Sequence, residues 1–130
     1  MARTVFISSL VPYTNMTKHA DIQEFLHGQV DCWNAGDRKS FLHHYRRMSP
    51  NGLSIAYAGQ PERDPWTTLE GMWAQQNSSV RIEVVTAIIN GNEAACHHRN
   101  CVLDGSRTID TIELYRFDEG RLDIRYFVAR

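Results

Sequence analysis

The chain has 130 residues, of which 42% are hydrophobic and 22% are charged, a balance typical of one globular domain with its own core. The formal net charge of −1 at pH 7 gives no indication of a surface for nucleic acid or for an anionic membrane. The three cysteines, Cys32, Cys96 and Cys101, lack the spacing of a metal site. We therefore expect free thiols in a cytoplasmic protein, with no metal and no other cofactor.

The first half of the chain is expected to be helical after a short arm. We expect residues 1–16 to form an N-terminal arm and residues 17–130 to form a single domain, with Thr17 as a candidate helix cap. Apolar residues recur at helical spacing over residues 22–33, and Gly36 marks the end of this first helix.

Two more helices and a strand are expected next. Asp37 is a candidate N-cap for a second helix that reaches Met48. Residues 53–58 read as a short strand. Asp64 and Pro65 fit the N-cap and first turn of a third helix.

The second half of the chain is expected to be β-structure. Strands are predicted over residues 81–89, 94–103, 106–117 and 121–128. The order α-α-β-α-β-β-β-β predicts an α+β domain, in which three helices pack on the concave face of a curved, mostly antiparallel sheet. Such a cone encloses a cavity of the kind in which small molecules bind.

Three segments in this order resemble the NTF2-like superfamily, in its SnoaL-like and ketosteroid isomerase-like branch. They are Trp-Asn-Ala-Gly-Asp at 33–37, Ile-Asn-Gly-Asn-Glu-Ala-Ala at 89–95, and residues 112–122. The resemblance implies a cone-shaped fold and a homodimer that pairs through the sheet. It leaves the activity open, because one fold carries many functions.

A two-residue turn at Asp104-Gly105 would set the register of a β-hairpin. It predicts His98 opposite Thr111 and Cys96 opposite Glu113, so that these four side chains share the face toward the cavity. The adjacent His97 would lie on the other face with the Arg99–Asp110 pair. Because His97 and His98 point in opposite directions, they cannot bind one metal ion together.

Glu113, His98 and Tyr57 are the candidate catalytic residues. By resemblance, Glu113 corresponds to the ketosteroid isomerase acid that hydrogen-bonds the substrate oxyanion, and Tyr57 to a position that faces the cavity. His98 is a candidate proton-transfer group, or else a neutral histidine hydrogen-bonded to Thr111. A three-residue turn at 118–120 would instead place Arg125 opposite Glu113 in a salt bridge.

Six further residues are expected to contact the substrate. Gln29, for example, is a polar residue on an apolar helix face, where it needs a partner or lines a cavity. The six are Gln29, Trp33, Cys96, Thr111, Tyr115 and Phe127.

These residues favour an isomerase or a lyase of the ketosteroid isomerase, dehydratase or cyclase kind. The reaction would be proton transfer next to a carbonyl group on a hydrophobic ring substrate. One alternative is non-catalytic binding of a small hydrophobic ligand by an NTF2-like dimer. Another is an interaction module in which side chains fill the cavity. None of these alternatives calls for a nucleic acid or a membrane as partner.

Overall fold

The structure, a computed structural model, describes residues 18–130, so the predicted arm at 1–16 and the Thr17 cap lie outside the described residues. Within that part of the chain, no helix is both long and apolar enough to cross a membrane. The elements in chain order are α1 (His19–Ala35), α2 (Arg38–Met48), β1 (Gly52–Tyr57), α3 (Pro65–Gln76), β2 (Val80–Asn90), β3 (Glu93–Val102), β4 (Thr108–Asp118) and β5 (Arg121–Val128).

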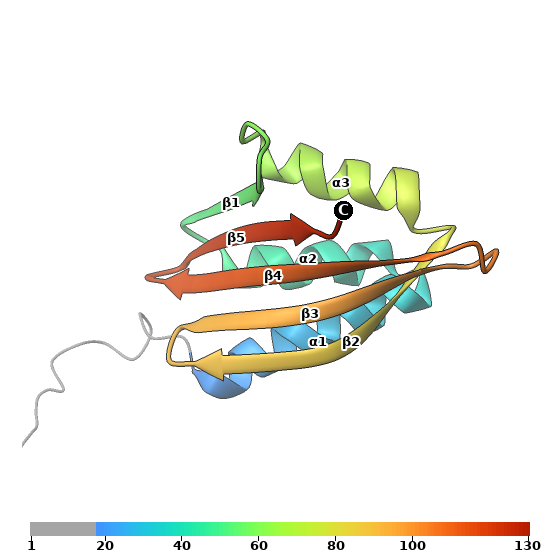
Figure 1. Cartoon of the computed structure of the whole chain (residues 1–130). Helices are drawn as coiled ribbons and strands as arrows, with labels where there is room; N and C mark the ends of the chain where they lie inside the picture. Colours follow the sequence, from blue (N-terminus) through green and yellow to red (C-terminus); the bar gives the residue numbers. More distant parts are fainter. Residues whose placement is uncertain (1–17) are drawn as a thin grey trace, which may run out of the picture.

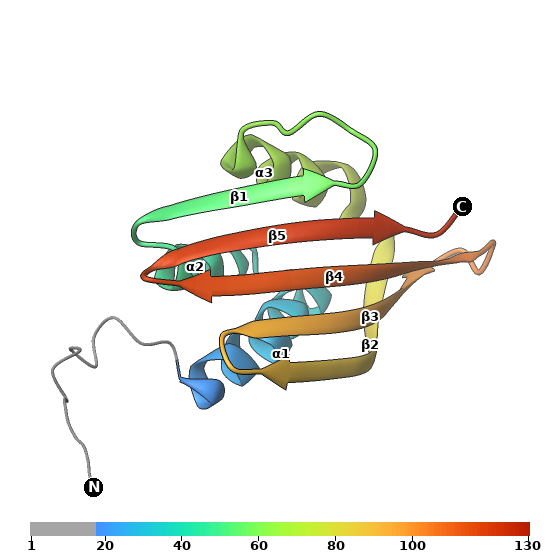
Figure 2. The same ribbon diagram turned by 60° about the vertical axis from the view of Figure 1, so that its left-hand side comes forward.

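The five strands form one curved sheet in the order β1-β5-β4-β3-β2, with the helices against its concave face (Figures 1 and 2). β1 runs parallel to β5, and every other neighbouring pair is antiparallel. The predicted fold class and element order are confirmed.

The end of α1 is tied to the start of β2 by side chains of the Trp-Asn motif. The indole Nε1 of Trp33 donates a hydrogen bond to the Val80 carbonyl at 2.9 Å. Asn34 pairs with the backbone of Ile82 as both donor and acceptor, each at 2.9 Å. These bonds satisfy the free backbone groups at the edge strand and fix the angle of α1 across the sheet.

The predicted register of the β3–β4 hairpin is confirmed, with His98 opposite Thr111 and Cys96 opposite Glu113. The loop is wider than a two-residue turn, since β3 ends at Val102 and β4 begins at Thr108. The register is kept because Val102 N donates to the Arg107 carbonyl at 3.1 Å across the loop base.

The predicted alternative of a salt bridge between Arg125 and Glu113 is wrong. Glu119 and Gly120 both have positive φ, 51° and 77°, and form a two-residue turn that pairs Asp118 with Arg121. Such a turn matches the twist of its strands, and glycine accepts it without strain. The register therefore places Tyr126 opposite Glu113, and Arg125 opposite Leu114 on the other face.

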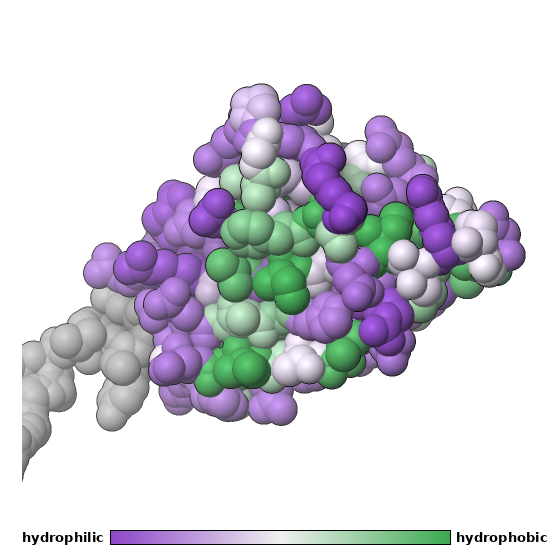
Figure 3. All heavy atoms as spheres, viewed as in Figure 1, coloured by the Kyte–Doolittle hydropathy of each residue, from purple (hydrophilic) through white to green (hydrophobic). Residues whose placement is uncertain are grey.

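Four exposed apolar residues lie on the convex face of the sheet, and we call them the convex patch: Ile88, Ile112, Leu114 and Phe127. Their exposed fractions range from 36% at Phe127 to 62% at Ile88. Figure 3 views this face and shows apolar side chains gathered on it and surrounded by hydrophilic ones. A contiguous patch of this kind usually marks an interaction surface.

His44 on α2 packs against α1 at Gly28, where a Cβ would lie 2.6 Å from Cε1 of His44. The pKa of His44 lies below its usual 6.5, first because of burial and then because of the Arg47 charge, with Glu24 acting in the opposite direction. The folded chain therefore takes up this proton less readily than the unfolded chain does. We expect full stability above about pH 6.5 and a loss as the pH falls below it.

Urea unfolding at about pH 7.5 and about pH 5.5 checks this prediction against the variant His44→Leu. The fall in unfolding free energy between the two pH values should be smaller in the variant. An equal fall in both proteins would assign the pH dependence to other histidines.

Candidate functional site

A cavity of about 350 Å³ lies between α3 and the concave face of the sheet. It is large enough for a small organic molecule. Its wall combines apolar side chains with polar ones, of which Tyr57, Asn100, Thr111, Glu113 and Tyr126 lie on the strands. The apolar lining is Met72, Val80, Val102, Ile109, Tyr126 ring carbons and Val128.

Glu113 and the two tyrosines form one row across the sheet. Tyr57 of β1 pairs with Tyr126 of β5, and Tyr126 pairs with Glu113 of β4. The rings of Tyr57 and Tyr126 lie 5.0 Å apart. Because adjacent strands lie about 4.8 Å apart, one bound ring can contact both the carboxylate and a phenol.

The Glu113 carboxylate is buried and held from three sides. Tyr115 donates its hydroxyl to Oε1, and the Thr111 hydroxyl donates to Oε2 at 3.2 Å. Nδ1 of His98 lies 3.0 Å from Oε2. The exposed fraction of Glu113 is 7%, so this carboxylate is fixed in position at the cavity wall by groups behind and beside it.

His98 has no well-aligned hydrogen bond at either ring nitrogen, although it is only 1% exposed. The 3.0 Å approach of Nδ1 to Glu113 is therefore a close polar contact that is out of line for an N–H donor. A buried imidazole without partners costs about 1–3 kcal/mol of stability. Its place against the Glu113 carboxylate makes His98 a candidate for a role beyond packing.

The Tyr57 hydroxyl is an available donor at the cavity wall. Within residues 18–130 it makes no hydrogen bond. Burial raises the pKa of Tyr57 to about 12, and the charge of Glu113 adds to this effect. The Tyr57 hydroxyl is therefore protonated near neutral pH and can donate a hydrogen bond to a substrate oxygen.

Tyr126 is held by a second chain of hydroxyl groups. It is hydrogen-bonded to Tyr45, and the Tyr45 hydroxyl donates to Oε1 of Gln29 at 3.0 Å. Burial, followed by the neighbouring Tyr45 and Glu113, raises the pKa of Tyr126 well above its usual value. Gln29 is thus an internal support that lies outside the cavity lining.

The structure separates the predicted site residues into three groups. Glu113, Tyr57 and Thr111 line the cavity, while His98 and Tyr115 contact Glu113 from outside it. The other four do not line it, and they are Gln29, Trp33, Cys96 and Phe127.

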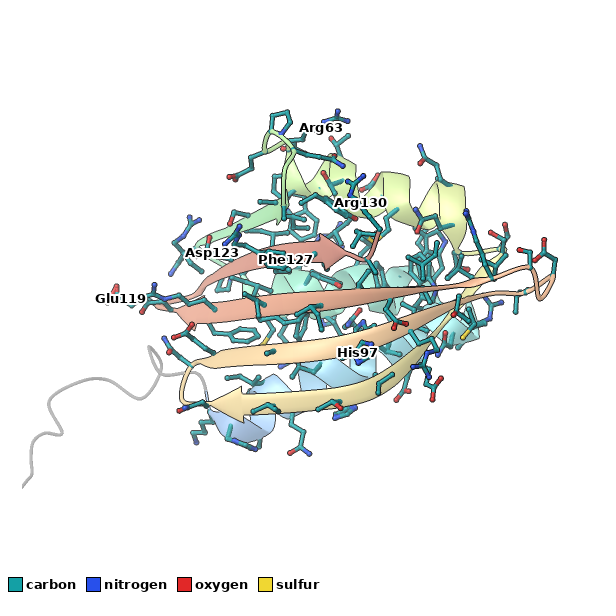
Figure 4. The ribbon with its side chains drawn as sticks, in the orientation of Figure 1. Arg63, His97, Glu119, Asp123, Phe127 and Arg130 are labelled. Carbon is teal, nitrogen blue, oxygen red and sulfur yellow. The ribbon has the colours of Figure 1, made fainter. Side chains whose placement is uncertain are left out.

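Three of those four residues are packed elsewhere in the fold. Trp33 is buried in the core against Phe41 and Trp73. Cys96 is buried, and burial followed by the Glu113 charge raises the pKa of its thiol to about 12, so the thiol is unreactive near neutral pH. Phe127 lies on the convex face, opposite Ile112 (Figure 4).

Sequence reasoning missed Tyr126, Asn100 and Arg107 in the cavity wall. The position of Tyr126 could have been predicted, because a two-residue turn at 119–120 places it directly opposite Glu113. Strand alternation gave a weaker indication for Asn100, which shares the inward face with His98. In the structure its side chain donates to Thr111 Oγ1 at 3.2 Å. Arg107 lies in the loop, where strand periodicity gives no orientation.

His97 and His98 point to opposite faces as predicted, with His97 in contact with Asp110 on the convex side at 3.3 Å (Figure 4). Across residues 18–130, no three His, Cys, Asp or Glu side chains are grouped so as to hold a metal ion.

A further hollow of about 390 Å³ lies on the convex face beside Ile88 and Leu114. It has no row of a carboxylate and phenols like that of Glu113, Tyr126 and Tyr57, so we place the candidate site in the concave cavity.

No protein-family model and no curated protein matches the chain. Among solved structures, a candidate SnoaL-like polyketide cyclase from Jannaschia sp. CCS1 matches with a TM-score of 0.64 and 11% identity, over 84% of this chain and 85% of its own. A candidate isomerase of the SnoaL-like family from Agrobacterium tumefaciens strain C58 matches with a TM-score of 0.65 and 14% identity, over 85% and 99%. An NTF2-like protein of unknown function from Burkholderia xenovorans LB400 matches with a TM-score of 0.66 and 13% identity, over 85% and 84%. At these identities the likeness concerns the fold, and the chain has the NTF2-like fold that SnoaL-like proteins share.

Proposed function

We propose that the protein is a small-molecule enzyme that transfers a proton next to a carbonyl group of a hydrophobic ring substrate. The observation that carries this proposal is the row formed by Glu113, Tyr126 and Tyr57 across one wall of an apolar cavity. A carboxylate acts there as the base, and a phenol acts as the hydrogen-bond donor. Both groups that enolate chemistry requires therefore face one bound molecule.

In the proposed step, the Glu113 carboxylate removes a proton from the carbon next to the carbonyl group. The C–H electrons form the enolate double bond, and the negative charge that develops on the oxygen is stabilised by the Tyr57 hydroxyl. If the ring also carries a double bond β,γ to the carbonyl group, the enolate is conjugated with it, and return of the proton from Glu113 to the γ-carbon gives isomerisation. If the substrate carries a β-hydroxyl group, that group leaves with the Glu113 proton as water, which is dehydration.

The other groups position Glu113 in this proposal. Tyr115 and Thr111 orient its two oxygens, and His98 lies 3.0 Å from Oε2 on the side away from the cavity. The sequence suggested that His98 would act on the substrate and that Glu113 would hold its oxygen. The proposal exchanges these roles, because Glu113 lines the cavity and His98 does not.

The proposal can be tested by measuring hydrogen–deuterium exchange in a model ketone. 2-Tetralone is a bicyclic ketone with acidic C–H bonds beside its carbonyl group, and 2-naphthol is a planar analogue of its enolate. In D₂O, we expect the protein to speed deuterium incorporation into 2-tetralone, as measured by NMR, and 2-naphthol to inhibit competitively. Binding of 2-naphthol without any exchange would refute catalysis and favour the alternative, non-catalytic binding of a hydrophobic ligand.

We also propose that the protein is a cytoplasmic homodimer that pairs through the convex patch. The patch is apolar and exposed, and all three cysteines are free thiols, which suits a reducing compartment. Sedimentation should give twice the mass of the chain, and Leu114→Glu should give a monomer because it places a charge in the buried interface. A wild-type protein that stays monomeric at all concentrations would contradict this pairing.

A further inference from the structure

Two hollows of the surface meet at Arg107. This residue and Ile109 line the catalytic cavity, and both also line a neighbouring hollow of about 480 Å³. The residues that line the second hollow come from the start of β4, from the chain after β5, from the β3–β4 loop and from β3. Figure 1 shows the end of β5 beside β4. The two hollows are therefore neighbours, and Arg107 lies between them.

Positive charge dominates the second hollow. Arg99, Arg107 and Arg130 line it, with Asp110 as the acidic residue of the lining. Figure 4 shows Arg130 beyond the end of β5. Three guanidinium groups around one open hollow are suited to an anion, because each presents a planar set of donors that matches oxyanions.

Two of these three arginines lack an acidic partner. Asp110 is already held by Arg99 Nε at 3.4 Å and by His97 at 3.3 Å, and Arg99 also reaches Glu83 at 3.7 Å. Within the described part of the chain, Arg107 and Arg130 form no ion pair.

The nearest acid in sequence does not neutralise Arg107. The pKa of Asp104 is lowered mainly by its hydrogen bonds with Ser106, and the charge of Arg107 is the last of the causes. The Asp104 carboxylate is thus held mainly by hydrogen bonds within its own loop. The Arg107 guanidinium can therefore bind another anion at the mouth of the cavity.

We infer that Arg107 and Arg130 form an anion subsite, and that the substrate is an amphipathic anion. Its hydrophobic ring system fills the cavity, and its carboxylate, sulfate or phosphate group binds at the mouth. This inference rests on the proposed function and adds the substrate class to it. Binding of the anion at the mouth would also orient the ring, since it leaves the opposite end of the molecule facing Glu113.

Two fluorescent probes that differ by one charged group test the subsite. 8-Anilinonaphthalene-1-sulfonate carries a sulfonate group, and N-phenyl-1-naphthylamine has the same aromatic rings without it. We expect the sulfonate to bind the wild-type protein more tightly than the neutral amine. We also expect added salt to weaken binding of the sulfonate and to leave that of the amine nearly unchanged.

The double variant Arg107→Gln/Arg130→Gln should weaken sulfonate binding by about fivefold to tenfold and leave amine binding unchanged. Arg38→Gln is the matched control for loss of an exposed arginine, since Arg38 on α2 lines neither the cavity nor the second hollow. Arg125→Gln is the control for the convex hollow, which is lined by Arg116 and Arg125 beside its apolar surface.

The probe experiments distinguish failure of the anion subsite from failure of the proposed function. Equal binding of both probes, unaffected by the double variant, would overturn the anion subsite while the cavity and its proposed chemistry stand. Loss of sulfonate binding in Arg125→Gln alone would place the anion on the convex face and would also overturn the subsite. Failure of both probes to bind would overturn the cavity, and with it the proposed function and the subsite.

Discussion

Replacement of Glu113 by glutamine is expected to slow deuterium exchange into 2-tetralone by about 10²- to 10⁴-fold, the usual contribution of a general base. Glutamine has the shape of glutamate but cannot accept the substrate proton. Because Thr111 and Tyr115 donate to different oxygens of Glu113, the amide oxygen of glutamine can accept from one hydroxyl, and the other hydroxyl can turn to accept from the amide N–H. The inhibitor 2-naphthol should therefore still bind, and the loss should appear in the turnover rate rather than in affinity.

Glu93→Gln is the matched control, because Glu93 is an exposed glutamate at the start of β3, away from the concave cavity. Its exchange rate should equal that of the wild-type protein. The two variants should also unfold at similar denaturant concentrations if the Glu113 variant keeps its fold. An exchange rate within a few-fold of wild type in Glu113→Gln would exclude this carboxylate as the base.

The inward face of the hairpin could be predicted because strand alternation has a period of two. Once Asp104-Gly105 was assigned to the turn, the faces of His97, His98 and Glu113 followed, and a loop wider than predicted did not change them. The same rule applied to a three-residue turn at 118–120 gave the wrong partner for Glu113. One residue more or less in that turn decides between Arg125 and Tyr126.

Periodicity indicates which face a residue is on but not whether that face is packed or open. Cys96 and Thr111 both point inward, yet Cys96 is covered by the core and Thr111 lines the cavity. The difference depends on where the helices lie across the sheet, which is set by long-range bonds such as that from Trp33 to Val80. Gln29 was assigned correctly to a buried face, but its partner Tyr45 is on another helix.

Phe25→Ala is expected to lower the free energy of unfolding by about 3–5 kcal/mol, a large part of the 5–15 kcal/mol that holds a domain of this kind together. Phe25 is fully buried on α1, and its ring meets those of Tyr45, Tyr115 and Phe117 edge-on at 5.0 to 5.8 Å. Removal of the ring leaves a cavity at the point where α1, α2 and β4 meet. It also removes the support behind Tyr115, whose hydroxyl orients Glu113.

Denaturant unfolding measures this effect, with Phe25→Leu as the milder variant and Leu103→Ala as the surface control. Leucine keeps much of the buried volume and should cost less than about 1.5 kcal/mol, whereas Leu103, which is 55% exposed, should cost less than about 0.5 kcal/mol. If Phe25→Ala costs no more than Leu103→Ala, the ring does not anchor α1 to the sheet. The cavity wall at Glu113 would then have to be held by the strand hydrogen bonds alone.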